Sequence, residues 1–255
     1  MKAYTAFVKK EFCEITRTYK LLILMLIFLI FGMMSPVTAK IMPKMINSFM
    51  TDGMKIIMPE PTVLDSWAQF FKNVSQMGFV ILIIVFSGIM ANEFSKGTLI
   101  IVLTKGLWRR TVIFSKFTAA CIVWTGAYIL SFAVSYAYTL YFWKDSTNNY
   151  NLIFSVFCLW LFGILLISTI IFGGVLFNSN YGCLLFVCIT IGIQFLLNII
   201  PKVQKYNPIS LASNNMSLLK GQLKISDFTV PIIIAVALII IFLISACAVF
   251  DKKKL

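Results

Sequence analysis

The sequence contains no histidine and has few charged residues. The absence of histidine excludes imidazole metal sites, Ser-His-Asp and Cys-His catalysis, and imidazole proton relays. Only 12% of the 255 residues are charged and 60% are hydrophobic, whereas soluble domains are about one quarter charged and about half apolar. The composition therefore predicts an integral membrane protein, and the length suits one membrane domain without a soluble catalytic domain beside it.

Acidic residues are scarce, and none lies deep within a segment that could span a membrane. Nine acidic residues are outnumbered by 22 lysines and arginines, which gives a net charge of +13. In a soluble chain this excess would suggest nucleic acid, but here it indicates membrane topology and a negatively charged leaflet. We therefore expect membrane lipids as partners and no nucleic acid. An ion-coupled secondary transporter needs ionisable groups within the membrane, so that alternative is disfavoured.

Motifs for catalysis and nucleotide binding are also missing. The six cysteines include no CxxC pair, so neither a zinc site nor a disulfide framework is indicated. No phosphate-binding loop of the GxxxxGK[ST] type occurs. The sequence predicts no catalytic, cofactor-binding or metal-binding residues, and therefore a protein that is not an enzyme.

Long uncharged runs predict six membrane-spanning helices. A bilayer core of about 30 Å needs about 20 residues of helix. The uncharged run from Ser146 to Pro201 holds 56 residues, or about 84 Å of helix, so it must turn. Asn178-Ser179-Asn180, with glycines on both sides, marks that turn. We predict one transmembrane domain over residues 1–255, with spans near 21–39, 77–92, 113–142, 153–177, 181–200 and 228–250.

The distribution of lysine and arginine predicts that both termini are cytoplasmic. Six spans put the two termini on the same side of the membrane. Thirteen of the 22 cations lie in the terminal segments and in the loop between the second and third spans. Short cytoplasmic segments are enriched in these residues. Because lysine far outnumbers arginine, as in AT-rich bacterial genomes, we expect a multi-pass protein of a bacterial plasma membrane.

Two segments outside the spans have helical patterns. In residues 1–18, apolar positions recur every three or four residues and the charged residues fall between them, which predicts a basic amphipathic helix in the membrane interface. Its apolar face is expected to contain Tyr4, Val8, Phe12, Ile15 and Tyr19.

The segment from residue 40 to 72 contains three prolines, so it cannot be one helix. A short surface helix is expected to begin with Asp65 as its N-cap and to carry Trp67, Phe70 and Phe71 along the surface.

The segment between Glu93 and Lys116 is the most informative part of the chain. Its apolar middle, TLIIVLT, is seven residues long and too short to span a bilayer. This pattern predicts a short cytoplasmic helix at the membrane surface. A carboxylate where the second span leaves the membrane is costly unless it is paired, so we expect Glu93 to pair with Arg109, Arg110 or Lys116.

This segment resembles the first cytoplasmic loop of type-2 ABC exporter permeases. In that family an acidic residue ends the second span, and Gly-Thr-Leu, an apolar stretch, a threonine, an arginine and a lysine follow. Gly106 stands where the family commonly has proline, which keeps the turn but departs from the pattern. The matching positions, in register and without a gap, are Glu93, Gly97, Thr98, Leu99, Leu103, Thr104, Arg109 and Lys116.

The resemblance implies a permease half-transporter whose loop couples it to a separate ABC ATP-binding subunit. Two copies of that subunit are expected beneath a pair of permeases, the second being another copy of this chain or a homologous permease. ATP and magnesium would be bound by the partner, and this chain would bind no cofactor. The loop residues, with the amino-terminal helix beside them, would be the docking and coupling element.

The translocation path and the substrate are less sharply defined. Gln194 and Asn198 lie four residues apart on one face of the fifth span. The resemblance implies that they face the path, but a hydrogen bond to a neighbouring helix is an equal alternative. The apolar, aromatic spans favour an amphipathic peptide or a hydrophobic compound as the substrate. A membrane immunity or assembly protein that transports nothing is the main alternative function.

Overall fold

A computed structural model describes residues 2–49, 60–95, 97, 108–144 and 149–253. These residues form helices and connecting turns, with no strand among them. Six helical stretches are long and apolar enough to cross a membrane, so the prediction of an all-α, six-span membrane protein is confirmed. Their bounds are Lys20–Pro43, Val63–Phe94, Arg109–Trp143, Tyr150–Phe177, Asn180–Asn198 and Ile225–Lys252.

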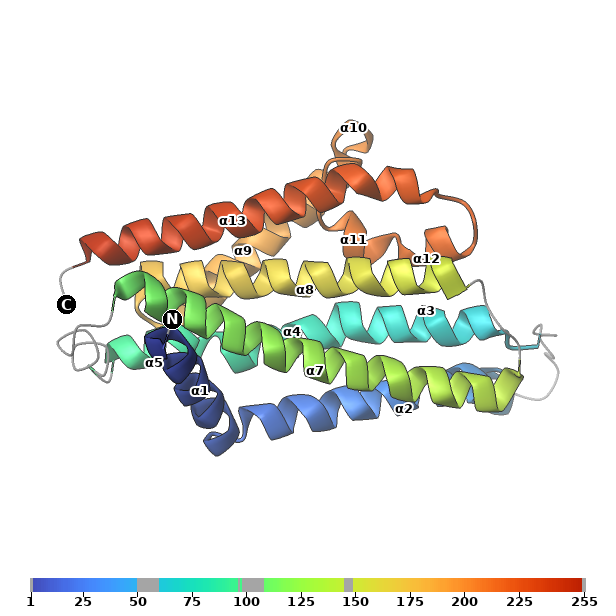
Figure 1. The fold of residues 1–255 in the computed structure, drawn as a ribbon. Helices are drawn as coiled ribbons and strands as arrows, with labels where there is room; N and C mark the ends of the chain where they lie inside the picture. The colour runs from blue at the N-terminus through green and yellow to red at the C-terminus, as the bar shows by residue number, and fades with distance from the viewer. Residues whose placement is uncertain (1, 50–59, 96, 98–107, 145–148, 254–255) are drawn as a thin grey trace.

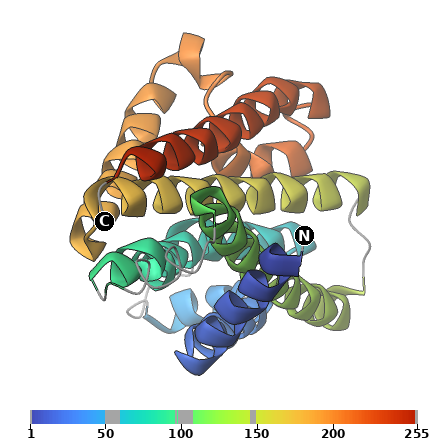
Figure 2. The same cartoon turned by 60° about the vertical axis from the view of Figure 1, so that its left-hand side comes forward.

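The long helices run side by side, and both termini lie at the same end of the bundle, here called the terminal end (Figure 1). Helix α1 crosses that end, and α10 projects from the side of the bundle (Figures 1 and 2). The helices are α1 (Lys2–Arg17), α2 (Lys20–Phe49), α3 (Val63–Asn73), the π-helix η1 (Val74–Gly78), α4 (Phe79–Phe86), α5 (Gly88–Ser95), α7 (Arg109–Trp143), α8 (Asn149–Phe177), α9 (Asn180–Asn198), α10 (Pro201–Gln204), α11 (Ser210–Ser213), α12 (Asn215–Leu219), the 3-10 helix η2 (Ile225–Phe228) and α13 (Thr229–Lys252).

The bundle core joins α2 to α7 and α8 to α13, which are its two most extensive helix pairs. Trp124 on α7 is fully buried and lies edge-on to Phe28 of α2, with ring centroids 5.4 Å apart. Gly163 on α8 faces the same indole ring, which a β-carbon at that position would overlap. Close approach of α7 and α8 therefore depends on the missing side chain at Gly163.

Helix α9 is the least enclosed of the spans. Only 17% of the most apolar segment of α9 is buried inside the bundle, whereas 72% of the most apolar segment of α8 is buried. Large apolar side chains such as Leu185, Ile189 and Leu196 are 60–66% exposed. Exposed apolar surface of this extent requires a lipid or protein partner. The predicted turn before α9 is confirmed, because α8 ends at Phe177 and α9 begins at Asn180.

The second span begins earlier than predicted. Helix α3 continues through η1 into α4, so the predicted span of 77–92 is the second half of a longer span, Val63–Phe94. Thr62 is the N-cap, and Asp65 is the third residue of the helix, where its carboxylate accepts a hydrogen bond from the Thr62 backbone N–H at 2.8 Å. The prediction that Asp65 is the N-cap was therefore wrong.

The expected surface position of the α3 aromatic residues was also wrong. Trp67, Phe70 and Phe71 are at most 3% exposed. Trp67 and Phe70 both pack against Phe132 of α7. The amphipathic pattern was read correctly, but the apolar face packs within the bundle, against α2 and α7, rather than in the membrane interface.

The buried face of α1 differs from the predicted one. Phe7, Glu11 and Ile15 are buried, whereas Phe12 and Tyr19 are 36% and 67% exposed. The buried stripe is spaced by four residues and has a carboxylate at its centre. The helix is amphipathic as predicted, but the face that contacts the bundle combines apolar packing with a charged group.

The chain after α9 folds back against the bundle. The Asn207 side-chain amide donates a hydrogen bond to the backbone carbonyl of Gln194, a residue within α9, at 2.6 Å. Helices α11 and α12 then pack on α8, and α12 also contacts α3. This segment therefore lies along the spanning helices, towards the end of the bundle that is opposite the terminal end.

We expect Gly163→Ala to destabilise the bundle because the added methyl group would overlap Trp124, which has no room to move. Overpacking of this kind typically costs about 1–3 kcal/mol. The matched control is Gly192→Ala on α9, where a β-carbon meets no atom within 4 Å. Thermal unfolding in detergent should show a lower apparent Tm for the Gly163 variant only. Equal midpoints for the two variants would contradict this account of the α7–α8 contact.

Candidate functional site

Five charged side chains meet at the terminal end of the bundle and form what we call the charge cluster. Three helices contribute to it: α1 provides Lys10, Glu11 and Glu14, α5 provides Glu93, and α7 provides Lys116. The Lys116 ammonium lies 2.8 Å from a Glu11 carboxylate oxygen and 3.1 Å from a Glu93 oxygen. Lys10 lies 2.9 Å from Glu11 and 2.8 Å from both Glu14 and Glu93.

The centre of the cluster is sealed from solvent. The side chains of Glu11, Glu93 and Lys116 are 2%, 7% and 1% exposed, whereas Lys10 and Glu14 are about half exposed. Burial of an unpaired charge is very unfavourable, so these side chains depend on one another. The cluster therefore ties α1, α5 and α7 together through ion pairs.

Helix α1 is held in register for these contacts by its own packing. Phe7 and Ile15 flank Glu11 on the buried face. The Tyr4 hydroxyl lies within hydrogen-bonding distance, 2.7 Å, of the Thr118 hydroxyl on α7. Successive residues four apart lie on one face of a helix, which directs Glu11 at Lys116.

The partly exposed members of the cluster stay ionised near neutral pH. Burial alone lowers the pKa of Lys10, but hydrogen bonds to Glu14 and Glu93 and the charge of Glu11 outweigh it, so this pKa lies above its ordinary value. Burial alone raises the pKa of Glu14, yet the bond to Lys10 and the nearby lysines bring it below its ordinary value. Both shifts favour the charged pair.

The three carboxylates of the cluster approach one another closely enough to suggest a metal site, because their oxygens lie within 4.8 Å. The ammonium groups of Lys10 and Lys116 already lie against these oxygens and supply two positive charges. The chemistry of the site is therefore that of an ion-pair network. The absence of metal-binding residues stays a prediction.

Arg109 and Arg110 are directed to the carboxyl end of α13, so Lys116 is the partner of Glu93 among the three cations considered. The Arg109 guanidinium donates hydrogen bonds to the backbone carbonyls of Phe250 and, at 2.7 Å, Lys253. Arg110 lies 3.5 Å from the Asp251 carboxylate. A cation at the carboxyl end of a helix binds its unpaired carbonyls and complements its dipole.

The last described residue, Lys253, extends this contact to α8, to the α8–α9 turn and to α5. Its ammonium donates hydrogen bonds to the Val175 carbonyl on α8 and to the Asn178 side chain in the α8–α9 turn. It also lies 4.7 Å from the ring centroid of Phe94 on α5. Burial lowers the pKa of Lys253. We call the contacts of Arg109, Arg110 and Lys253 the C-terminal joint.

The structure brings together only part of the predicted coupling motif. Glu93 and Lys116 are in direct contact, and Arg109 begins α7. Gly97 has a φ angle of +65°, the left-handed conformation that favours glycine. Thr98, Leu99, Leu103 and Thr104, and with them the predicted coupling helix, lie outside the described residues.

Gln194 and Asn198 lie on α9, away from the cluster. Both are half-buried, and their side-chain carbonyl oxygens are buried without a hydrogen-bond partner in the described part of the chain. Such groups carry a free-energy cost until they find a donor. This arrangement leaves both predicted roles open: a position on a path, and a contact with another helix.

Sequence reasoning missed Lys10, Glu11 and Glu14 as members of the site. The available signal was the four-residue spacing of Phe7, Glu11 and Ile15, which places an acid in the middle of an apolar stripe. A carboxylate on a buried face needs a cation from another helix. Of the three candidate cations, Lys116 lies within the predicted third span, 113–142, whereas Arg109 and Arg110 precede that span.

The fold and site define a class: a six-span helical membrane protein with ion-paired helix ends at the terminal end. The sequence matches the family described as ABC-2 family transporter protein over residues 5–255. The chain therefore belongs to that family, and the resemblance drawn from the sequence is confirmed. Members are membrane components that are generally not catalytic, and membership implies association with an ATP-binding subunit in general.

A relative in Bacillus subtilis (strain 168) is similar along most of its length. The relative carries the description "Uncharacterized transmembrane protein YxlG". It is 21% identical to this chain over 215 residues, which covers 83% of each sequence. That similarity agrees with a membrane protein of the same architecture.

We expect Lys116→Met to destabilise the protein strongly, because it removes a cation from between two buried carboxylates. Breaking a buried ion pair in this way costs about 3–5 kcal/mol. Lys9→Met, an exposed lysine on α1, is the matched control and should change stability by less than about 0.5 kcal/mol.

Thermal unfolding in detergent measures both variants. The double variant Glu11→Gln with Lys116→Met should regain part of the loss, because it also removes the carboxylate left behind. A Lys116 variant as stable as the Lys9 variant would show that the cluster does not hold these helices together.

Proposed function

We propose that the chain is the permease subunit of an ATP-driven ABC exporter in a bacterial plasma membrane, with both termini cytoplasmic. It would form the translocation path and take its energy from a separate ATP-binding subunit. The observation that carries this proposal is the charge cluster. It lies at the flank of residues 96–107, the segment whose sequence resembles the ATPase-docking loop of type-2 exporters.

The contacts on both flanks of that segment explain how a docked ATPase would move the membrane helices. On one flank, Glu93 is bound to Lys116 and Lys10, so a pull on α5 acts on α7 and α1 together. On the other flank, Arg109 holds the end of α13, and Lys253 reaches α8. A displacement of the segment would therefore reach several spans at once instead of bending a single loop.

The motor is proposed to be a partner because the sequence lacks a phosphate-binding loop and histidine. ATP and magnesium would be bound there. We propose two copies of the ATP-binding subunit beneath two permeases, the second being another copy of this chain or a homologue. The exposed apolar face of α9 supports a position beside that second permease. The side-chain amide oxygens of Gln194 and Asn198, which have no hydrogen-bond partner among the described residues, support it too.

The proposed orientation rests on charge. Lysines and arginines of α1, of the start of α7 and of the carboxyl terminus gather at the terminal end, as expected for a cytoplasmic face. The proposed substrate is an amphipathic peptide or a hydrophobic compound. Apolar and aromatic spans with acidic residues only near their ends favour such a molecule over a small ion.

The first experiment is purification of the tagged chain from its native membrane in mild detergent. A stoichiometric ATP-binding subunit should accompany it. A preparation without such a subunit would favour the alternative, a membrane immunity or assembly protein that needs no ATPase.

The second experiment tests the coupling role in the assembled transporter. We expect Glu93→Gln to lower both substrate-stimulated ATP hydrolysis and export by about 5-fold or more, the range of typical coupling free energies. Basal ATP hydrolysis should change little, since the partner performs the chemistry. Glu60→Gln, an exposed glutamate before α3, is the control. Unchanged stimulation and export in the Glu93 variant would refute the coupling role.

A further inference from the structure

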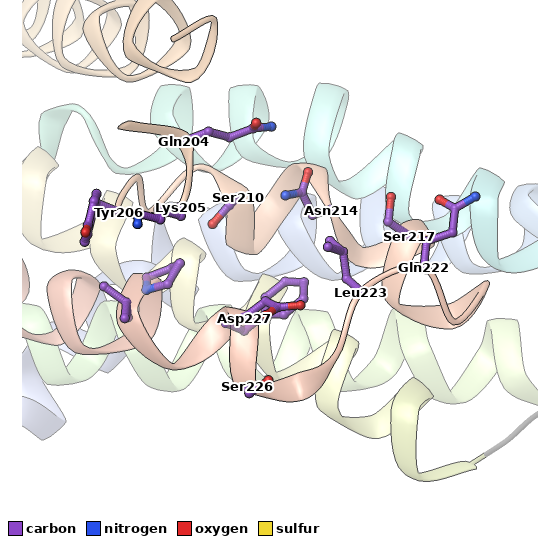
Figure 3. Close-up of a pocket in the computed structure, with 13 residues that line it drawn as sticks. Gln204, Lys205, Tyr206, Ser210, Asn214, Ser217, Gln222, Leu223, Ser226 and Asp227 are labelled. Carbon is purple, nitrogen blue, oxygen red and sulfur yellow. The ribbon is translucent and has the colours of Figure 1, made fainter. Parts of the chain in front are cut away.

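A pocket of about 600 Å³ lies between the segment that follows α9 and the first turns of α13 (Figure 3). One wall comes from the end of α10 and from α11 and α12, and the other from η2 and the start of α13. This volume is within the range of small-molecule sites, about 300–1,000 Å³. The pocket is remote from the charge cluster and takes no part in the proposed coupling.

The pocket lies where the headgroups of a bilayer meet its apolar core. Helix α13 has 24 residues, or about 36 Å of helix, which exceeds an apolar core of about 30 Å. Its first turn, at Thr229, therefore lies at one boundary of that core. Tyr206, half-exposed beside Lys205, is an aromatic–lysine pair of the kind found at this depth.

Opposite charges line the two walls. Lys205, on the first wall, lies with its ammonium 4.9 Å from the Tyr206 ring centroid and is exposed. Asp227, on the second wall, is also exposed, and one of its carboxylate oxygens accepts a hydrogen bond from the Lys224 backbone N–H at 2.9 Å. No ion pair joins Lys205 to Asp227 in the described chain. An anion can approach one wall and a cation the other.

The remaining lining combines small hydrogen-bonding groups with an apolar edge. Asn214, at the end of α11, presents its side-chain amide, whereas the Ser210 hydroxyl donates its hydrogen bond to the Asn207 backbone carbonyl at 2.8 Å. Val230 and Pro231 form an apolar wall on α13. Val230 continues along α13 into an apolar face on which Ile233 is 62% exposed. A bound molecule thus has polar contacts in the pocket and an apolar surface leading away from it along the span.

We propose that this pocket binds the headgroup of a zwitterionic aminophospholipid. The phosphate contacts Lys205, the ammonium contacts Asp227, and the acyl chains lie along the exposed face of α13. The Asn214 side-chain amide donates hydrogen bonds to the ester and phosphate oxygens. A purely anionic headgroup would place a negative charge against the Asp227 carboxylate. A purely cationic headgroup would place a positive charge against the Lys205 ammonium. Both arrangements are repulsive.

The test uses the full-length chain with defined lipids. The purified protein is titrated with phosphatidylethanolamine, phosphatidylcholine or phosphatidylglycerol, and native mass spectrometry counts the retained lipids. Phosphatidylethanolamine should be retained best. Phosphatidylcholine should bind more weakly because its trimethylammonium group has no N–H to donate to Asp227.

Three variants assign the contacts. Lys205→Gln and Asp227→Asn should each weaken phosphatidylethanolamine binding by about 10-fold, the value of one charge-assisted hydrogen bond. Asparagine keeps the oxygen that caps Lys224, so the local fold is preserved. Lys202→Gln removes an exposed lysine of α10 that does not line the pocket, and it should bind lipid as the wild type does.

Several outcomes would overturn the proposal. One is equal retention of phosphatidylglycerol with no effect of Asp227→Asn, which would indicate a simple anion site. Others are the absence of retained lipid in the wild type, and unchanged binding in both pocket variants. Displacement of the lipid by an exported peptide, with the same dependence on Lys205 and Asp227, would assign the pocket to substrate instead.

Discussion

The buried pairing of Lys116 with Glu11 and Glu93 is the interaction on which the terminal end of this protein depends. A charged group transferred into an apolar environment is stable only with partners, and here no single helix supplies both signs of charge at the centre. Glu11 comes from α1, Glu93 from α5 and Lys116 from α7, so both ion pairs of Lys116 exist only when the three helices are docked. The same contacts that remove the electrostatic penalty therefore fix the positions of those helices.

This arrangement divides the molecule into a firmly joined part and a loosely held one. Helices α1, α5 and α7 are connected by the charge cluster, and the C-terminal joint adds α8 and α13 through Arg109 and Lys253. Helix α9 contacts chiefly α8 among the long helices and exposes most of its apolar surface. In the account proposed here, ATPase motion moves the joined part as a unit, and the opening of a path occurs beside α9.

Much of the fold was predictable because bilayer thickness constrains helix length. Six spans, the turn at Asn178–Asn180 and the pairing of Glu93 with one of three nearby cations all followed from the positions of charges and turn residues. These features depend on local sequence and on the approximate length of a spanning helix, both of which can be read without tertiary information.

The details that escaped prediction depend on contacts between distant residues. Trp67 and Phe70 have the amphipathic spacing of a surface helix, and only the positions of the neighbouring helices, α2 and α7 among them, determine that they are buried. Glu11 looked like one more charge on a basic helix until Lys116, 105 residues later, was placed against it. Arg109 likewise has its partners more than 140 residues away, at the carboxyl end of α13. Local patterns identify such faces but not what covers them.

The most direct test of the central claim is a distance measurement within the assembled transporter. Spin labels would be attached at Cys13 on α1 and at Phe114→Cys on α7, both exposed positions, with the other cysteines replaced. A second pair would join Cys13 to Leu196→Cys near the end of α9, away from the contacts that hold the α8–α9 turn. Between the nucleotide-free and ATP-trapped states, the account predicts an unchanged α1–α7 distance and a changed α1–α9 distance. A change in the α1–α7 distance as large as that to α9 would contradict it.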